Sequence, residues 1–354
     1  WILPPHVTLF GCIVAFLLLF TWRVIYSRVV VRAFELQSVL FVGISPLVKE
    51  IGRLFGYRPH LGFVSAGYLA DAEDPEAPPE CGPWRGTASE VKRAVQDVRP
   101  SLLAVGMMER RGRLPVEDLL DLRFGGLRIE EAARVYETVS GRVHTKDLKP
   151  SQLIYSETLA SLLLQSIYSF FIALAALLLL WPLMLLTVIV LKLTSKGPAL
   201  YRQTRVGFNG QNFTLYKFRS MYVDAEARTG AVWATRHDPR ITPVGYWLRM
   251  LRIDELPQLL NVLRGEMSIV GPRPERPEFV RVLSERIPFY RQRHAVKPGL
   301  TGWAQINHGY ADTVEDTVIK LEYDLYYIKN ITPALDFYIM FHTLKTMILR
   351  RGAH

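Results

Sequence analysis

Two adjacent carboxylates, Asp254 and Glu255, stand just before a proline in a stretch rich in leucine and arginine. Proline is tolerated in the first turn of a helix, because the N–H group that it lacks would have no partner there. We therefore expect Asp254 and Glu255 to begin a helix that Gly265 ends. A helix N-terminus favours ionised carboxylates by ~0.3–1 kcal/mol each, and a nucleophile or a magnesium ligand must be ionised. An acidic first turn that only caps the helix is the plainer interpretation, and the surrounding residues decide between the two.

Further segments flank this pair in a specific order. They are Lys217-Phe-Arg-Ser-Met221, Asp238-Pro-Arg-Ile-Thr242, Ser268-Ile-Val-Gly-Pro-Arg-Pro274, Lys297-Pro-Gly-Leu-Thr-Gly-Trp-Ala-Gln305 and Tyr323-Asp-Leu-Tyr-Tyr-Ile-Lys-Asn330. With the pair itself, the set resembles the bacterial sugar transferases, the monotopic polyprenyl-phosphate sugar-1-phosphate transferases that start exopolysaccharide and other glycan assembly. The resemblance covers roughly residues 165–350. Each segment alone is a weak signal, but the ordered set is specific.

The resemblance implies an undecaprenyl-phosphate hexose-1-phosphate transferase. Such an enzyme moves a sugar-1-phosphate from a UDP-sugar to undecaprenyl phosphate and releases UMP. The resemblance assigns the catalytic pair to Asp254 and Glu255. Asp254 is the expected nucleophile, which forms a covalent phosphosugar intermediate. Glu255 is the expected magnesium ligand or partner acid or base.

The implied reaction needs cations around a diphosphate. Mg²⁺ is the expected cofactor, with Asp254, Glu255 and Asp336 as its expected protein ligands. Pro272 and Pro274 form a rigid turn that holds Arg273, which in the family lies by the nucleotide. Any single basic side chain is more often only a solvated charge. The other candidates for phosphate binding are Lys217, Arg219, Arg240, Arg249 and Arg252.

Composition points to a membrane surface. The chain of 354 residues allows two or more domains, and 49% of its residues are hydrophobic. Its net charge of +10 fits either nucleic acid or an anionic membrane with phosphorylated substrates. Long apolar runs favour the membrane, so we expect no nucleic-acid partner. Cys12 and Cys81 are too few and too scattered for a disulfide framework or a zinc site.

The N-terminal segment, residues 1–30, is expected to be a transmembrane helix. Val7–Trp22 is nearly all apolar, and Arg23 and Arg28 follow it, which places that end in the cytoplasm. A buried helix of a soluble domain is the alternative. Because the chain does not begin with Met, we expect this helix to be the end of a larger membrane region.

Residues 36–150 alternate between strand and helix patterns, which predicts a parallel, Rossmann-like sheet. Strands are expected at Val39–Gly43, Leu61–Tyr68 and Leu102–Gly106, and Ser45 followed by Pro46 predicts a helix start. Only one glycine and a proline occupy the loop after the first strand, where a dinucleotide site needs three glycines. We therefore expect this domain to have lost dinucleotide binding and to serve assembly, such as a homodimer, or regulation.

Residues 158–196 contain the longest apolar run, 34 residues from Thr158 to Leu191 without a charge. One straight helix of this length would be ~51 Å long, against ~30 Å of membrane hydrocarbon. Pro182 lies inside the run and predicts a kink or break. Basic residues flank both ends, so we expect a re-entrant membrane helix with Pro182 at its deepest point. An ordinary kinked span is the alternative.

Residues 197–354 are expected to form a mainly helical α+β catalytic domain. Pro198–Met221 alternates like a β-hairpin around Gly207 and Gly210, and it delivers Lys217. Leucines and a tryptophan in Tyr246–Leu263 recur at spacings near 3 and 4. They could pack a core or lie at the membrane interface at headgroup height. The fold class is therefore a membrane-associated α/β chain at the bacterial inner membrane, with its catalytic domain on the cytoplasmic face.

Two other functions remain open. A glycosyltransferase that moves only the sugar would release a nucleoside diphosphate. A scaffold for polysaccharide export would have no use for adjacent carboxylates among arginines, so Asp254 and Glu255 argue against it.

Overall fold

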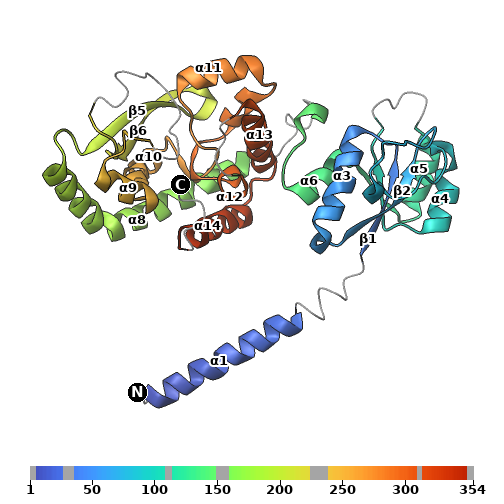
Figure 1. Cartoon of the computed structure of the whole chain (residues 1–354), viewed down its shortest axis with the longest axis horizontal. Helices are drawn as coiled ribbons and strands as arrows, with labels where there is room; N and C mark the ends of the chain where they lie inside the picture. The colour runs from blue at the N-terminus through green and yellow to red at the C-terminus, as the bar shows by residue number, and fades with distance from the viewer. Residues whose placement is uncertain are drawn as a thin grey trace. The chain divides into compact units, whose positions relative to one another are not determined.

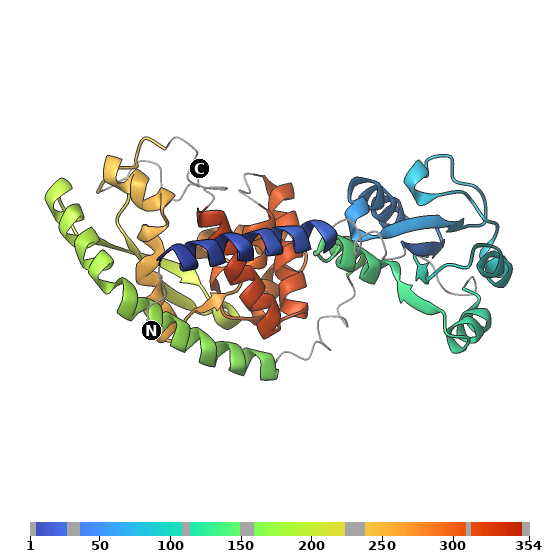
Figure 2. The ribbon, with the colours of Figure 1, turned by 90° about the horizontal axis from the view of Figure 1, so that it is seen from below.

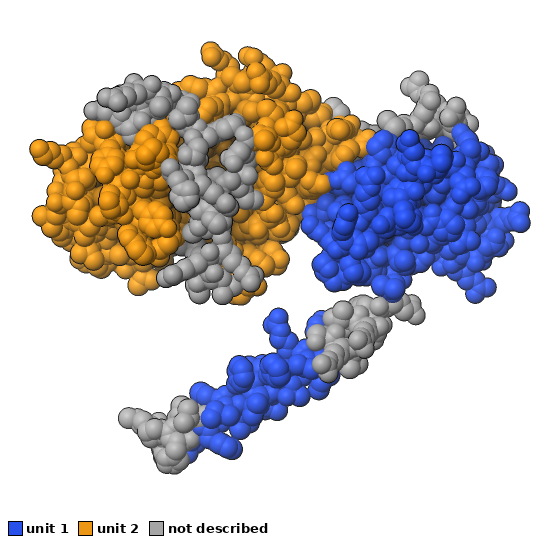
Figure 3. Space-filling view, in the orientation of Figure 1, with its two compact units in different colours: residues 1–140 blue, residues 141–354 orange. Residues whose placement is uncertain are grey.

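The protein divides into two compact units, residues 1–140 and residues 141–354 (Figure 3). The first unit therefore ends before residue 150, the expected limit of the Rossmann-like domain. Each unit has its own hydrophobic core. The structure, a computed structural model, describes residues 5–26, 36–107, 114–148, 159–223, 238–308 and 313–348.

The first unit is built on a four-stranded parallel sheet in the order β2-β1-β3-β4. Alternate residues of β1 enter opposite cores, with Val39 and Phe41 under α3 and α6, and Leu40 and Val42 under α4 and α5 (Figure 1). Burial on both faces explains the continuous apolar run of this strand. The strands are β1 (Gln37–Val42), β2 (Phe63–Leu69), β3 (Leu102–Val105) and β4 (Arg128–Glu131), and the helices are α3 (Pro46–Tyr57), α4 (Val91–Val98), α5 (Val116–Phe124) and α6 (Ala132–Ser140).

The expected parallel sheet is confirmed, and so is the helix start at Ser45, whose hydroxyl accepts a hydrogen bond from the N–H of Val48. The loop after β1 lies tightly against the end of β3. A Cβ atom added at Gly43 would meet Cγ of Met107 at 2.5 Å. This glycine therefore permits close packing of two chain segments. The pair β4 and α6 was not expected, because the sequence of β4, Arg-Ile-Glu-Glu, is mostly charged.

One helix of the described residues is long and apolar enough to cross a membrane, and it lies in α8 (Leu159–Thr194). With 36 residues it is ~54 Å long. The helix continues through Pro182 without the expected break and instead curves along its length (Figure 2). The apolar part of α1 (Pro5–Ile25), Phe10–Ile25, is shorter.

The α8 helix buries several polar residues and exposes many apolar ones. Gln165, Ser169 and Thr187 are at most 5% exposed, and the first two bond to other elements of the second unit. The exposed side chains include Leu163, Ile167, Phe171, Leu179, Trp181, Leu186, Ile189 and Leu193. A helix with this pattern suits an apolar environment rather than water.

Several elements of the second unit pack on α8. Residues from α8, α10, α13 and α14 and the short strand β7 form its main core. The expected hairpin is confirmed as an antiparallel pair, while β7 and β8 are parallel. The strands are β5 (Leu200–Val206), β6 (Asn212–Phe218), β7 (Ser268–Val270) and β8 (Gly299–Thr301). The helices are α9 (Pro243–Met250), α10 (Leu259–Leu263), α11 (Pro277–Arg286), α12 (Trp303–Asn307), α13 (Val314–Lys329) and α14 (Pro333–Ile348).

Candidate active site

Asp254 and Glu255 lie in a 3-10 helix, η7 (Ile253–Gln258), which precedes α10. The expected α-helix is therefore wrong in its first part. Pro257 has no N–H group to donate to the carbonyl of Ile253, so an α-helix cannot start regularly at Ile253. The expected end is confirmed, because Gly265 has φ +76°, a conformation that favours glycine.

Glu255 is surrounded by positive charge. Its Oε1 atom accepts hydrogen bonds from Nη2 of Arg273 at 2.7 Å and from Nζ of Lys217 at 3.2 Å. Its Oε2 atom lies 3.7 Å from Nη1 of Arg252. Burial alone would raise the pKa of Glu255, but these three cations together lower it far below its ordinary value. Glu255 is thus an ionised carboxylate whose oxygens already have cationic partners.

Asp254 has a different environment although it is the next residue in the chain. Asp254 is 6% exposed, and its buried Oδ1 atom has no hydrogen-bond partner among the described residues. Burial and the charge of Glu255 raise the pKa of Asp254 to about 6, against the lowering effect of Lys217, Arg249 and Arg273. A desolvated carboxylate oxygen without a partner is available for attack on an electrophile.

Arg249 supplies a second unpaired polar atom at this site. Its Nη1 atom is buried and donates to no partner among the described residues, and its charge lowers the pKa of both Asp254 and Asp238. A buried guanidinium nitrogen without a partner costs free energy unless a ligand binds it. Asp254 and Arg249 together therefore leave one acceptor and one donor free for a ligand with phosphate groups.

The structure brings Lys217, Arg249, Arg252 and Arg273 to the carboxylate pair, but it employs Arg219 and Arg240 elsewhere. Arg219 is buried and donates to the carbonyl oxygens of Ser195 and Lys196 at the end of α8. Arg240 forms a two-nitrogen ion pair with Asp238. In this structure both side chains hold protein groups rather than facing the pair.

Asp336 also lies apart from the pair. It is fully buried in the first turn of α14, where it accepts hydrogen bonds from Gln165, Tyr168 and Tyr327. No three side chains of His, Cys, Asp or Glu in the described ranges are grouped as a metal site. The expected set of three carboxylate ligands is therefore not assembled. Asp336 instead joins α8, α13 and α14.

The profile of a family described as "Bacterial sugar transferase" matches residues 160–350, more than half of the chain. The chain belongs to the bacterial sugar transferase family.

Three relatives of this sugar transferase illustrate the range of the match. An Aeromonas hydrophila protein, named UDP-N-acetylgalactosamine-undecaprenyl-phosphate N-acetylgalactosaminephosphotransferase, is 46% identical over 62% of this chain and 52% of its own length. A Xanthomonas campestris pv. campestris protein, named UDP-glucose:undecaprenyl-phosphate glucose-1-phosphate transferase, is 34% identical over 90% of this chain and 68% of its own. The exopolysaccharide production protein PSS of Rhizobium leguminosarum bv. phaseoli is 41% identical over 53% of this chain and 97% of its own. The chain thus spans about half the length of the first of these relatives.

Magnesium fits the sugar transferase site through Asp254. Its Oδ1 atom is a buried carboxylate oxygen without a partner, and both oxygens of Glu255 already lie beside cations. Magnesium is usually held by one or two carboxylates together with substrate phosphates. Asp254 is therefore the protein ligand that the geometry offers, and Glu255 is better described as the residue that orders Lys217, Arg252 and Arg273.

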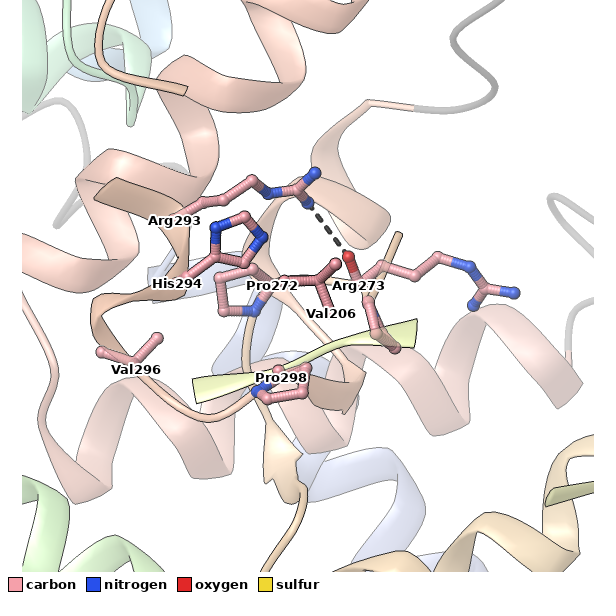
Figure 4. Close-up of a pocket in the computed structure, with 9 residues that line it drawn as sticks. Val206, Pro272, Arg273, Arg293, His294, Val296 and Pro298 are labelled. Carbon is pink, nitrogen blue, oxygen red and sulfur yellow. Dashed lines mark hydrogen bonds between the residues drawn. The ribbon is translucent and has the colours of Figure 1, made fainter. Parts of the chain in front are cut away.

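The sequence motifs assigned no role to a buried group of charged residues next to the backbone of Arg273. Arg293 is 3% exposed and donates to the carbonyl oxygen of Arg273 (Figure 4). It also donates to Asp324. The same group includes Arg205, whose Nη1 atom lies 3.5 Å from Oε2 of Glu275. A signal was present in Asp324, an acidic residue between Tyr323 and Leu325 in α13.

Proposed function

We propose that this protein transfers a sugar-1-phosphate from a UDP-sugar to undecaprenyl phosphate and releases UMP. The observation that carries the proposal is the buried, unpaired Oδ1 atom of Asp254 beside Arg249 and Lys217. Membership of the sugar transferase family supports it, as do the printed activities of the Aeromonas and Xanthomonas relatives. The reaction would be the first membrane step of exopolysaccharide or other glycan synthesis.

In the proposed mechanism, a carboxylate oxygen of Asp254 attacks the phosphorus that bears the sugar. The bond from that phosphorus to the bridging oxygen of the diphosphate breaks, and UMP leaves with the electron pair. A phosphate oxygen of undecaprenyl phosphate then attacks the same phosphorus and expels the Asp254 carboxylate. Arg249 and Lys217 stabilise the negative charge on the phosphate oxygens. Magnesium, when bound, would neutralise charge on the diphosphate.

We infer that the membrane holds the catalytic unit through α8. Its exposed apolar side chains and its buried polar ones support insertion in lipid. Lysines near both ends favour a re-entrant course in the inner membrane, with Pro182 at the deepest point of the curved helix and the site on the cytoplasmic face. In this proposal α1 is a transmembrane helix, and the first unit contributes to a homodimer or to regulation.

Nucleotide release tests the proposal directly. Detergent-extracted protein is incubated with undecaprenyl phosphate, Mg²⁺ and a panel of UDP-sugars, with uridine-linked glucose and galactose first. Wild type should release UMP, and Asp254→Asn should release none. Asp121→Asn, which removes a surface acid paired with Lys92 in the first unit, is the matched control.

The products separate the alternatives. Release of UDP would establish simple glycosyl transfer and refute the phosphosugar mechanism. Absence of release with every sugar would favour a scaffold. A burst of UMP, equal in amount to the protein and formed without undecaprenyl phosphate, is expected if Asp254 forms a covalent intermediate. Absence of the burst alongside full turnover would refute that intermediate.

A further inference from the structure

The segment from Pro272 to Glu275, here called the strap, carries the Arg273 side chain to Glu255. Two of its four residues are prolines, so its backbone is stiff. Every carbonyl group in it accepts a hydrogen bond from another part of the unit. The donors are the N–H of Gly299 to Pro272 (2.9 Å), Nη2 of Arg293 to Arg273 (3.0 Å), Nη1 of Arg205 to Pro274 (3.0 Å) and the N–H of Val206 to Glu275 (2.9 Å).

Arg293 is the most buried of these donors. Its side chain is 3% exposed, and its guanidinium reaches Oδ2 of Asp324 at 2.8 Å and the hydroxyl of Tyr290 at 2.7 Å. Burying an ion pair away from water carries a large desolvation penalty, and apolar residues of similar size are often at least as stabilising. Stability alone therefore does not explain why the fold retains Arg293 and Asp324 here.

Arg205 and Glu275 hold the other end of the strap. The carboxylate of Glu275 lies 2.7 Å from Nζ of Lys320 and 3.5 Å from Nη1 of Arg205. Lys320 and Asp324 are four residues apart on α13, so they lie on one face of that helix. A single helix thus anchors the strap at Glu275 directly and at Arg273 through Arg293.

The backbone carbonyl and the side chain of Arg273 point in different directions (Figure 4). Its carbonyl oxygen points to Arg293, while its side chain runs away from Arg293. The guanidinium at the far end donates to Glu255 at 2.7 Å and is 34% exposed. The buried network therefore touches only the backbone of Arg273, and the nitrogen atoms of its side chain remain directed to the carboxylate pair.

We propose that Arg293 and Asp324, with Arg205 and Glu275, are positioning residues for the transfer reaction, which hold Arg273 against Glu255 through the strap backbone. This inference rests on the proposed function. A displacement of about 1 Å at a reacting centre can reduce a rate by about 100-fold. The network acts on the reaction only through Arg273, and this distinguishes positioning from a general contribution to stability.

A double-mutant cycle on UMP release tests the proposal. Arg293→Met with Asp324→Leu removes both buried charges at once, so the fold is retained while the Arg273 carbonyl loses its donor. We expect kcat to fall about 10- to 100-fold. In the Arg273→Gln background the same double substitution should cause no further fall, because its effect passes through Arg273. Backbone amide exchange in the peptide 268–276 should also become faster in the double variant.

Glu322→Gln is the matched control. Glu322 is another buried acid of α13, but it accepts hydrogen bonds from Thr145 rather than from the strap. This change should lower the melting temperature and leave kcat unchanged. If the double variant does not fold, Arg205→Lys removes the donor to Pro274 and keeps a positive charge beside Glu275.

The outcomes are decisive in each case. Full activity of the folded double variant, or of Arg205→Lys when the double variant does not fold, would overturn the proposal. Multiplicative losses in the Arg273→Gln background would also overturn it, because the network would then act independently of Arg273. Equal kcat in Arg273→Gln with and without the double substitution would support it. If wild type itself released UDP or nothing, the proposed function would fail, and amide exchange would still report whether the network holds the strap.

Discussion

At the scale of single residues, Asp254 and Glu255 show how neighbours in sequence acquire opposite roles. Glu255 lies among three cations and is stabilised as an anion, whereas Asp254 is buried without a hydrogen bond on Oδ1. Pairs of carboxylates whose environments separate their pKa values are a common basis for dividing catalytic roles. In the proposed mechanism, Asp254 therefore supplies the reactive oxygen and Glu255 orders the cations.

The pH dependence of the reaction should reflect Asp254. Its pKa is raised to about 6, and attack requires the ionised form, so kcat/KM for UMP release should fall as the pH drops below about 6. Arg249→Gln removes a charge that lowers this pKa, so the acid limb should move to higher pH. Arg202→Gln, on the hairpin strand β5, is the control. An acid limb that stays in place in Arg249→Gln would contradict this assignment.

Asp254→Asn should stabilise the fold while it abolishes transfer. The folded-state pKa exceeds the ordinary value of 3.8, so the wild type loses stability as the pH rises from about 4 to about 6. The free energy of unfolding of the variant should therefore exceed that of wild type at pH 7.5 by on the order of 1–3 kcal/mol. The difference should vanish below about pH 4, which denaturant titrations at several pH values would show.

Glu255→Gln should have the opposite effect. Its pKa is lowered in the folded state, so its charge stabilises the fold above the ordinary value of 4.5, and this stability is lost as the pH falls. Removing the charge at pH 7.5 leaves Lys217 and Arg273 without their carboxylate. We expect a loss of about 3 kcal/mol or more in the free energy of unfolding. A gain in stability from Glu255→Gln would contradict the described network.

At the scale of elements, local sequence patterns correctly predicted the features that depend on neighbouring residues, such as a tight turn or a helix cap. The hairpin followed from alternation and glycines, and the start of α3 followed from Ser45 and Pro46. The 3-10 form of η7 was missed because Pro257 was assigned to the first turn of an α-helix, whereas its missing N–H group prevents a regular start at Ile253. The strand β4 was missed because packing rather than local propensity decides it. The partners of Arg293 were also hidden, because Asp324 is 31 residues away in the chain.

Arg219 illustrates the same limit and gives a prediction at this scale. Its guanidinium group donates to two carbonyl groups just after the end of α8, where Gly197 with φ +112° turns the chain. Arg219→Lys cannot span both carbonyls and should lower the free energy of unfolding by about 1–3 kcal/mol. Thermal unfolding would measure this loss. The KM for the UDP-sugar, measured by steady-state kinetics, should stay unchanged. A large rise in KM would restore Arg219 to the phosphate site.

At the scale of the whole molecule, the residues of the site and of the strap network all belong to residues 141–354, which form a compact unit with its own core. The Rhizobium relative matches over 194 residues, which is 97% of its length and only 53% of this chain. Because the match takes up nearly all of that protein, few of its residues remain to form a counterpart of the first unit. The first unit is therefore expected to modify the transferase rather than to complete its active site.

Expression of residues 141–354 alone tests this division of labour. Because α8 carries a large exposed apolar surface, the fragment should require detergent or membrane, as we also expect of the full chain. It should fold cooperatively and release UMP at a rate comparable to that of the full chain, since its core and its site are complete without the first unit. The same fragment with Asp254→Asn is the control for contaminating activity. A folded fragment without activity would show that the first unit contributes to catalysis, whereas an unfolded fragment would show that the two cores depend on each other.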